Sequence, residues 1–197
     1  MSFVNLDEGD VYCKILYLGP DQTGKATNLL YLRERLSSSG LLSEGSLNKS
    51  DHVGFLCLPL ELRMESKWKV RVHLYSANLN RLPSSVIKVL MKGVDGCVYV
   101  MDSDLTRLHH NREALLFAED VMKREGLPLV TLPRVFQYNK RDLKDALSTS
   151  VLQTALNPHL FPEIQAISQS GQGVEETLTM ITQRVLDKVS QQTNLKK

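Results

Sequence analysis

Residues 15–30, ILYLGPDQTGKATNLL, have the pattern of a strand, a glycine-containing turn and the start of a helix. The turn has the spacing G-x-x-x-x-G-K, in which glycines let successive backbone N–H groups point at phosphate oxygens. The lysine reaches the terminal phosphates, and the N-terminus of the helix adds its dipole. The turn therefore predicts a phosphate-binding loop, with an ordinary strand-to-helix turn as the alternative. The residues expected to line the phosphates are Gly19, Asp21, Gln22, Thr23, Gly24, Lys25, Ala26 and Thr27.

One position in this loop departs from the usual pattern. Lys25 is followed by Ala26, where an intact loop has a serine or threonine hydroxyl that binds Mg²⁺. Thr27 comes next, but one residue along a helix turns the side chain by about 100°. We therefore expect the loop to hold phosphate and to hold Mg²⁺ poorly, and we predict no metal-ligating side chain.

Strand-like and helix-like segments alternate along the chain. The order predicts an α/β fold of the P-loop NTPase type, with about six mostly parallel strands, one antiparallel edge strand and helices on both faces. Residues 69–74 alternate aliphatic with polar side chains, as in a strand near a sheet edge with one wet face. Expected strands lie at 11–18, 53–62, 68–75, 96–102, 133–140 and 163–168, and expected helices at 25–36, 84–92, 106–125, 143–154 and from 174.

Composition limits the classes of protein to consider. The 197 residues, 42% of them hydrophobic, fit one domain over 1–197, with residues 190–197 as a flexible tail. The net charge of +2 gives no electrostatic reason to expect nucleic acid as a partner. Three widely spaced cysteines predict buried reduced thiols in a cytoplasmic protein. No signal peptide, lipid-anchor motif or membrane-spanning run is present in the sequence, so we expect no membrane anchor.

A second motif, NKRD, follows the strand RVFQY. At that place, the Asp142 carboxylate can accept two hydrogen bonds from the N1–H and exocyclic amine of guanine, a pair that adenine does not offer. Lys140 would pack over the base, and Asn139 would brace the loop. Ser168 and Gln169 in the last loop would contact the base edge. The alternative is a helix N-terminus with Asp142 as its cap.

With these motifs in place, the chain resembles a Ras-like small GTPase, and more closely the bacterial gliding-motility group called MglA. The segments that carry the resemblance are YLGPDQTGKATNL, FLCLPLEL, VRVHLYS, KGVDGCVYVMDS and NKRDL. The similarity extends over nearly the whole chain. The resemblance implies a cytoplasmic switch that marks a cell pole, directs motility machinery and is turned off by a roadblock-type GAP.

The chain departs from that group around the γ-phosphate. Where the group has T-V-P-G-Q, this chain has SANLN, so that Leu79 stands for the glycine and Asn80 for the glutamine. A Cβ restricts the backbone flip that presents an N–H to the γ-phosphate, and asparagine is one methylene too short to position the attacking water. In the first switch, His52 stands for the Mg²⁺-binding threonine and Asp51 for the arginine finger.

These departures lead to three hypotheses. The first is a degenerate GTPase that binds GDP or GTP weakly, hydrolyses GTP very slowly or not at all, and acts as a monomer through protein partners. These would be a roadblock-type GAP and polar or motility scaffold proteins. The second is a slow GTPase that a GAP completes with its own arginine. The third is a P-loop ATPase in which Asp102, at the end of an apolar strand, orients the metal.

Overall fold

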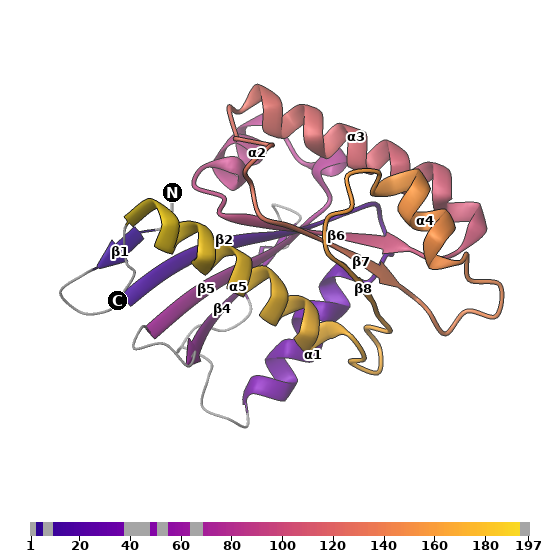
Figure 1. Ribbon diagram of the computed structural model, residues 1–197, viewed down its shortest axis with the longest axis horizontal. Coiled ribbons are helices and arrows are strands. Elements are labelled where there is room, and N and C mark those ends of the chain that lie inside the picture. Colours follow the sequence, from indigo (N-terminus) through magenta and orange to yellow (C-terminus); the bar gives the residue numbers. More distant parts are fainter. Residues whose placement is uncertain (1–2, 6–9, 38–47, 51–54, 64–68, 194–197) are drawn as a thin grey trace.

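The computed structural model describes residues 3–5, 10–37, 48–50, 55–63 and 69–193. Within these residues the chain forms one sheet in the order β3-β4-β5-β2-β6-β7-β8, with β1 paired to β2 (Figure 1). The strands are β1 (Phe3–Asn5), β2 (Asp10–Leu18), β3 (Asn48–Ser50), β4 (Phe55–Arg63), β5 (Lys69–Ala77), β6 (Gly96–Asp102), β7 (Arg134–Asn139) and β8 (Glu163–Gln165). The helices are α1 (Lys25–Ser37), α2 (Ser84–Met91), α3 (Leu108–Arg124), α4 (Thr149–Leu156) and α5 (Val174–Thr193).

The α/β fold class is confirmed. The six expected strands are present, and β2 pairs in parallel with both β5 and β6, as do β6 with β7 and β7 with β8. β4 pairs antiparallel with β5, as the hairpin predicted. The short strands β1 and β3 extend the sheet beyond the six.

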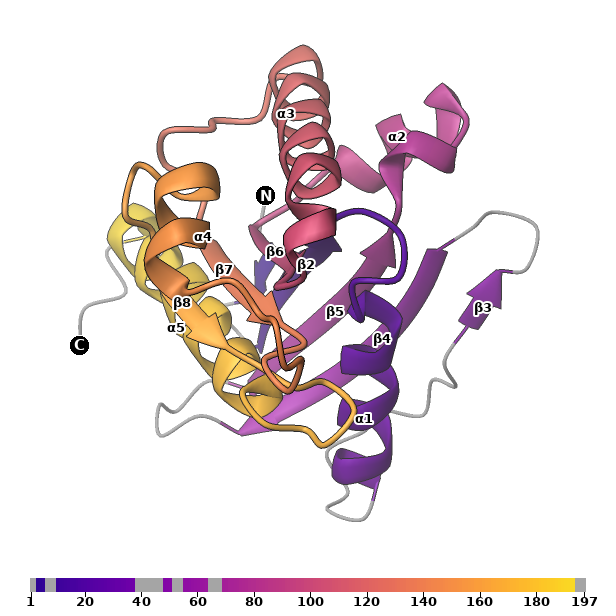
Figure 2. The same ribbon diagram turned by 90° about the vertical axis from the view of Figure 1, so that its right-hand side faces the viewer.

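Helices cover both faces of the sheet. Figures 1 and 2 show α1 and α5 on one face and α2, α3 and α4 on the other. Each layer has its own core, since alternate residues of β2 point to opposite faces: Ile15 and Tyr17 pack with α1 and α5, whereas Leu16 and Leu18 pack with α2 and α3. β6 is buried at all its residues, as expected of a strand covered on both sides.

Three expectations about local structure need correction. β5 lies between β4 and β2 rather than at the sheet edge, although its burial alternates as predicted. The fourth helix begins at Thr149 and not near residue 143, because Ser148 caps it by accepting a hydrogen bond from the Val151 N–H. α5 continues through residues 190–193, which we expected to begin the tail, and residues 194–197 lie outside the described part.

The thiols match the expectation of buried cysteines in part. Cys13 and Cys97 are buried, Cys57 is half-buried, and all three are free. Burial raises the pKa of the Cys13 thiol to about 12, and that of Cys97 likewise. Among the helices that the structure describes, none is both long enough and apolar enough to cross a bilayer.

Candidate nucleotide site

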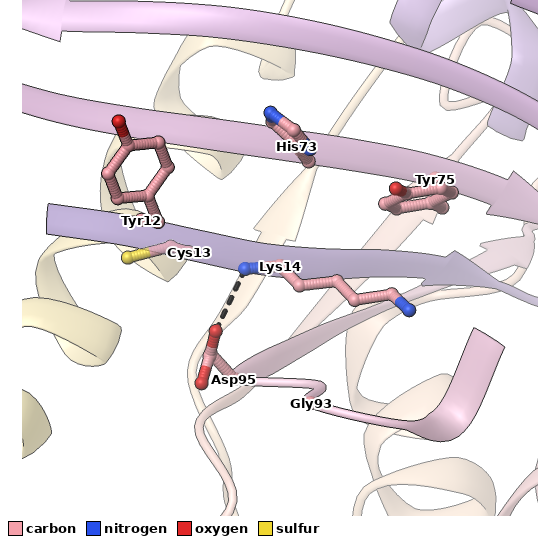
Figure 3. Close-up of a pocket in the computed structure, with 7 residues that line it drawn as sticks. All are labelled: Tyr12, Cys13, Lys14, His73, Tyr75, Gly93 and Asp95. Carbon is pink, nitrogen blue, oxygen red and sulfur yellow. Dashed lines mark hydrogen bonds between the residues drawn. The ribbon is translucent and has the colours of Figure 1, made fainter. Parts of the chain in front are cut away.

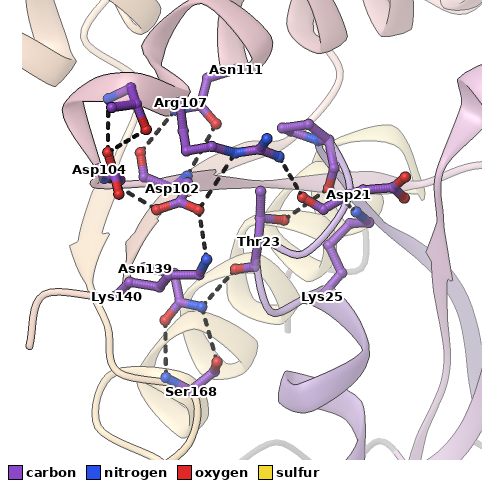
Figure 4. Close-up of polar contacts among 12 residues, drawn as sticks. Asp21, Thr23, Lys25, Asp102, Asp104, Arg107, Asn111, Asn139, Lys140 and Ser168 are labelled. Carbon is purple, nitrogen blue, oxygen red and sulfur yellow. Dashed lines mark hydrogen bonds and ion pairs between the residues drawn. The ribbon is translucent and has the colours of Figure 1, made fainter. Parts of the chain in front are cut away.

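The candidate site lies where several strands of the sheet end. The phosphate loop follows β2, the segment from Asn78 follows β5, Asp102 ends β6 and Asn139 ends β7. Because all four strands are parallel, their carboxyl ends meet at one edge of the sheet, which is where open α/β sheets bind ligands. Figure 4 shows the polar side chains of the loop and of the ends of β6 and β7 directed toward one another.

The phosphate loop has the backbone that its glycines predicted. Gly19 has a φ of +144° and Gly24 a φ of +94°, values that L side chains rarely adopt. A Cβ at Gly19 would run into the Val100 carbonyl, and a Cβ at Gly24 would run into the Asn139 amide. The loop is therefore closed tightly against both β6 and the base motif.

Lys25 is held inside the loop. Its Nζ donates to the Gly19 carbonyl at 2.8 Å and to the Pro20 carbonyl, and only 7% of the residue is exposed. Burial lowers the pKa of this ammonium to about 8; the Asp21 carboxylate opposes the shift and Arg81 adds to it. A phosphate entering the loop would offer the ammonium a stronger acceptor than the two carbonyls.

The other loop residues divide into buried and exposed positions. Thr23 is buried and its hydroxyl donates to the Pro20 carbonyl at 3.2 Å. Gln22 is exposed and has a φ of +60°. Ala26 is exposed on the first turn of α1, and Thr27 beside it is half-buried. The position after Lys25 thus carries no side-chain oxygen that could bind a metal.

Asn139 joins the phosphate loop to the base motif and to the last loop. Its Nδ2 donates to the Thr23 carbonyl at 2.7 Å and to the Ser168 Oγ at 2.9 Å. Its Oδ1 accepts from the Ser168 N–H at 2.9 Å. Asn139 and Ser168 are both buried, so three loops that are distant in sequence are fixed to one amide group.

The other residues predicted to contact the base are close in sequence to the two ends of this bridge, Lys140 and Asp142 to Asn139 and Gln169 to Ser168. Lys140 has a φ of +62° and directs its ammonium to the Asp102 Oδ2 at 2.7 Å. Asp142 and Gln169 are exposed, so both side chains are accessible to a ligand. Asp142 is not a helix cap, because the next helix begins at Thr149 with Ser148 as its cap.

Asp102, the metal-orienting acid of the ATPase hypothesis, is fully buried and already has partners. Its Oδ2 contacts Lys140 and lies 3.9 Å from the Arg107 Nε, and its Oδ1 accepts from the Asp104 N–H at 3.1 Å. The Asn111 side chain forms two hydrogen bonds with the backbone of Asp102: it accepts from the Asp102 N–H and donates to the Asp102 carbonyl. This carboxylate braces the base motif.

The second-switch segment is packed rather than open. Leu79 begins a short 3₁₀ helix, Leu79–Arg81, and is only 5% exposed, in the same core cluster as Leu18 and Met101. Asn80 is exposed. His52 and Asp51 lie outside the described residues, so the first-switch expectations remain predictions.

Sequence reasoning missed the contacts that Asp21 makes. Its carboxylate accepts from the Asn78 Nδ2 at 2.5 Å and pairs with Arg81, and its carbonyl accepts from the Arg107 Nη2 at 2.8 Å. These partners come from two other segments of the chain, and no spacing rule connects them with the loop.

A buried polar trio was also missed. Asn28 in α1 and Gln137 in β7 exchange two hydrogen bonds of 2.9 Å, and Gln137 also donates to the Thr177 Oγ1 in α5 at 2.8 Å. Asn28 in addition donates to the Gly24 carbonyl at 2.8 Å. A glutamine within the apolar strand RVFQYN was the one available signal for such a contact.

A pocket elsewhere in the described part of the chain is a poor candidate for the nucleotide. It opens beside the N-terminal half of β2, away from the phosphate loop, and its volume is about 150 Å³, below the usual range for ligand sites (Figure 3). Lys14, one of the residues that line it, reaches the end of α2, where its Nζ donates to the carbonyls of Val89 and Lys92. The pocket is lined by Tyr12, Cys13, Lys14, His73, Tyr75, Gly93 and Asp95.

Comparison with known proteins places this geometry in context. The chain is 37% identical over 188 residues to the mutual gliding-motility protein MglA of Myxococcus xanthus (strain DK1622). The match covers 94% of this chain and 96% of that protein. No protein-family model matches the chain.

Proposed function

Because the chain belongs to the MglA family of Ras-like gliding-motility GTPases, we propose that it is a regulatory protein that binds guanine nucleotide weakly and acts through protein partners. The observation that carries this proposal is the Asn139 bridge, which fixes the phosphate loop, the base motif and the last loop to one another. Such a bridge sets the distance between a phosphate site and a base site. An ordinary strand-to-helix turn does not require a side-chain bridge to two other loops.

Guanine is the base that the side chains of the NKRD turn favour. Asp142 is exposed next to the bridge and can accept from the two adjacent N–H groups of guanine. Lys140 lies at the same turn, held in a left-handed conformation that keeps its side chain beside the strand end. The ATPase hypothesis loses support, since Asp102 is committed to Lys140 and Arg107.

Hydrolysis is the weak part of this site, and we propose that it is impaired. Ala26 offers no oxygen to Mg²⁺, and Leu79 is held in the core where a glycine would be free to flip. The acids near the loop, Asp21 and Asp102, are already bonded to cationic or amide groups. The described residues of the loop therefore do not supply the side-chain oxygen that Mg²⁺ binds in an intact loop.

Impaired Mg²⁺ binding and hydrolysis also affect how the chain would bind protein partners. If γ-phosphate and Mg²⁺ do not order the switch segments, the surface that partners meet depends little on nucleotide state. By resemblance, these partners are a roadblock-type GAP and polar or motility scaffold proteins. The chain would bind them as a cytoplasmic monomer that is recruited to a cell pole. A GAP that supplies its own arginine would make the chain a slow GTPase instead.

Competition binding tests the nucleotide assignment. GDP should displace a fluorescent guanine nucleotide far better than ADP does, and Asp142→Ala should weaken GDP at least about tenfold because two charge-assisted hydrogen bonds are lost. Asp145→Ala removes another exposed acid three residues further on and should leave the affinity unchanged. Equal displacement by GDP and ADP would exclude a guanine site.

Single-turnover hydrolysis tests the second half of the proposal. The purified chain should convert bound GTP to GDP negligibly, with or without Mg²⁺. Addition of a roadblock-type partner distinguishes a degenerate GTPase from a slow GTPase that a GAP completes, because only in the second case would GTP hydrolysis become faster. Turnover by the chain alone at the rate of an intact small GTPase would contradict impaired hydrolysis.

A further inference from the structure

Asp21 brings a negative charge into a loop that is shaped to surround phosphate. Its carboxylate is bound by two residues of the segment that follows β5. The Asn78 Nδ2 donates to Oδ1 at 2.5 Å, and the Arg81 guanidinium forms an ion pair with Oδ2. Both oxygens therefore have partners from the same four residues. A carboxylate with two such partners has the contacts that a phosphate oxygen would otherwise attract.

The backbone of Asp21 is fixed as well. Arg107 donates to the Asp21 carbonyl at 2.8 Å, and its Nε lies 3.9 Å from the buried Asp102 carboxylate. The Arg107 guanidinium therefore links the phosphate loop to the end of β6 (Figure 4). The backbone that carries the Asp21 carboxylate is therefore held by the fold.

The segment that Asp21 holds is also anchored on its other side. Leu79 inserts into the core, while the Arg81 N–H bonds the Asn78 carbonyl at 3.1 Å and the Leu82 N–H bonds the Leu79 carbonyl at 3.2 Å. The segment Asn78–Leu82 is thus pinned between the core and the phosphate loop. In a GTPase switch, the corresponding order comes from the γ-phosphate and is lost on hydrolysis.

We propose that Asp21 is a built-in acidic ligand that takes the place of a terminal phosphate, so that Asn78–Leu82 keeps one position with triphosphate, with diphosphate or without nucleotide. This inference rests on the proposed function, because it describes the regulation of the same site. It has a second consequence for binding. The Asp21 carboxylate repels an added γ-phosphate, so the loop favours diphosphate over triphosphate.

Hydrogen–deuterium exchange of residues 78–82 tests the proposal on the purified full chain. In the wild type, exchange of this segment should be the same without nucleotide, with GDP and with a non-hydrolysable GTP analogue. Asp21→Ala should speed it about fivefold, since an ion pair and a charged hydrogen bond are both lost. Arg81→Ala should produce part of that effect. Asp120→Ala, which removes a similar exposed aspartate–arginine pair with Arg124 on α3, is the matched control and should not change it.

Nucleotide affinity gives the second measurement. Asp21→Ala should raise the affinity for the GTP analogue relative to GDP by about tenfold, as expected when a like charge next to the γ-phosphate is removed. Unchanged exchange of residues 78–82 in both Asp21→Ala and Arg81→Ala would overturn the proposal, and so would nucleotide-dependent exchange in the wild type. If the wild type binds no guanine nucleotide, the proposed function fails, while the nucleotide-free comparison still decides whether Asp21 holds the segment.

Discussion

The ammonium of Lys140 lies 2.7 Å from the buried Asp102 carboxylate, so the cation of the base motif is tied to the end of the neighbouring strand. This pair should be strongly coupled, because Asp102 is fully buried and Lys140 only partly exposed. In a double-mutant cycle with Asp102→Asn and Lys140→Met, we expect a coupling free energy of about 1–2 kcal/mol from urea unfolding. The exposed Asp120–Arg124 pair on α3 serves as the control cycle and should give about 0.5 kcal/mol. A coupling no larger than that control would mean that the buried pair does not brace the base motif.

The phosphate affinity should depend on pH through Lys25. Burial lowers the pKa of this ammonium from 10.5 to about 8, so a growing fraction of the lysine is neutral as the pH rises through 8. Since the neutral amine does not attract phosphate, GDP affinity should fall by about fourfold between pH 7 and pH 8.5. Isothermal titration at several pH values measures this, and Lys25→Met should bind weakly with no such slope. A slope that persists in Lys25→Met would assign the titration to another group.

The lowered pKa of Lys25 also makes the free energy of unfolding depend on pH. Between pH 8 and 10.5 the folded chain binds fewer protons at Lys25 than the unfolded chain does, so the contribution of this residue to the free energy of unfolding rises over that interval. The thiols act in the opposite direction: burial raises the pKa of Cys13 and Cys97 from 9.0 to about 12, so stability is lost as pH rises above 9. Replacing Lys25 with methionine should remove the first contribution and leave the second.

Leu79 should be needed for stability, although the resemblance places it at a switch glycine. The residue is 5% exposed within the core, so Leu79→Ala should cost about 2–4 kcal/mol of unfolding free energy. Leu79→Gly should cost about 1 kcal/mol more through backbone entropy. The exposed neighbour gives the comparison: Asn80→Gln should change stability by less than about 0.5 kcal/mol. Urea unfolding followed by circular dichroism measures all three, and a loss below about 1 kcal/mol in Leu79→Ala would contradict the packed position.

Restoring a hydroxyl after Lys25 should restore a response to Mg²⁺. Ala26 is exposed on the first turn of α1, so Ala26→Ser should fold normally. Affinity for a GTP analogue should become about tenfold tighter with Mg²⁺ than with a chelator in this variant, and change less than about threefold in the wild type. Thr27→Ala should behave as the wild type does, because that hydroxyl lies on another side of the helix. A strongly Mg²⁺-dependent wild type would show that other ligands suffice.

The local structure that the sequence predicted correctly is that in which local chemistry decides the backbone. The phosphate loop needs glycines at positive φ and a helix N-terminus, and both are encoded within residues 19–25. The strands were found because their apolar runs are bounded by glycine, proline or charge. The sequence predicts an edge position for β5, because one polar face is typical of an edge strand. In the structure that face is wet although strands flank β5 on both sides.

The contacts that could not be predicted join residues far apart in the chain. Asn78 and Asp21 are separated by 57 positions, and Arg107 and Asp21 by 86, so only the meeting of strand ends brings them together. The boundary of α4 was wrong for a similar reason. Leu147 donates its N–H to the Ser103 carbonyl and Ala146 bridges to Asp104, which keeps the preceding turn out of the helix.

The polar trio of Asn28, Gln137 and Thr177 has a consequence for how fast and how tightly a ligand can bind. It clamps the helix that begins at the phosphate loop, the strand that ends at the base motif and the last helix to one another inside the core. The loops at the ends of these elements are thereby held at a fixed spacing before a ligand arrives, so we expect little conformational entropy to be lost when it docks. Association should then be limited by encounter rather than by rearrangement, and differences in affinity between ligands should appear in their residence times.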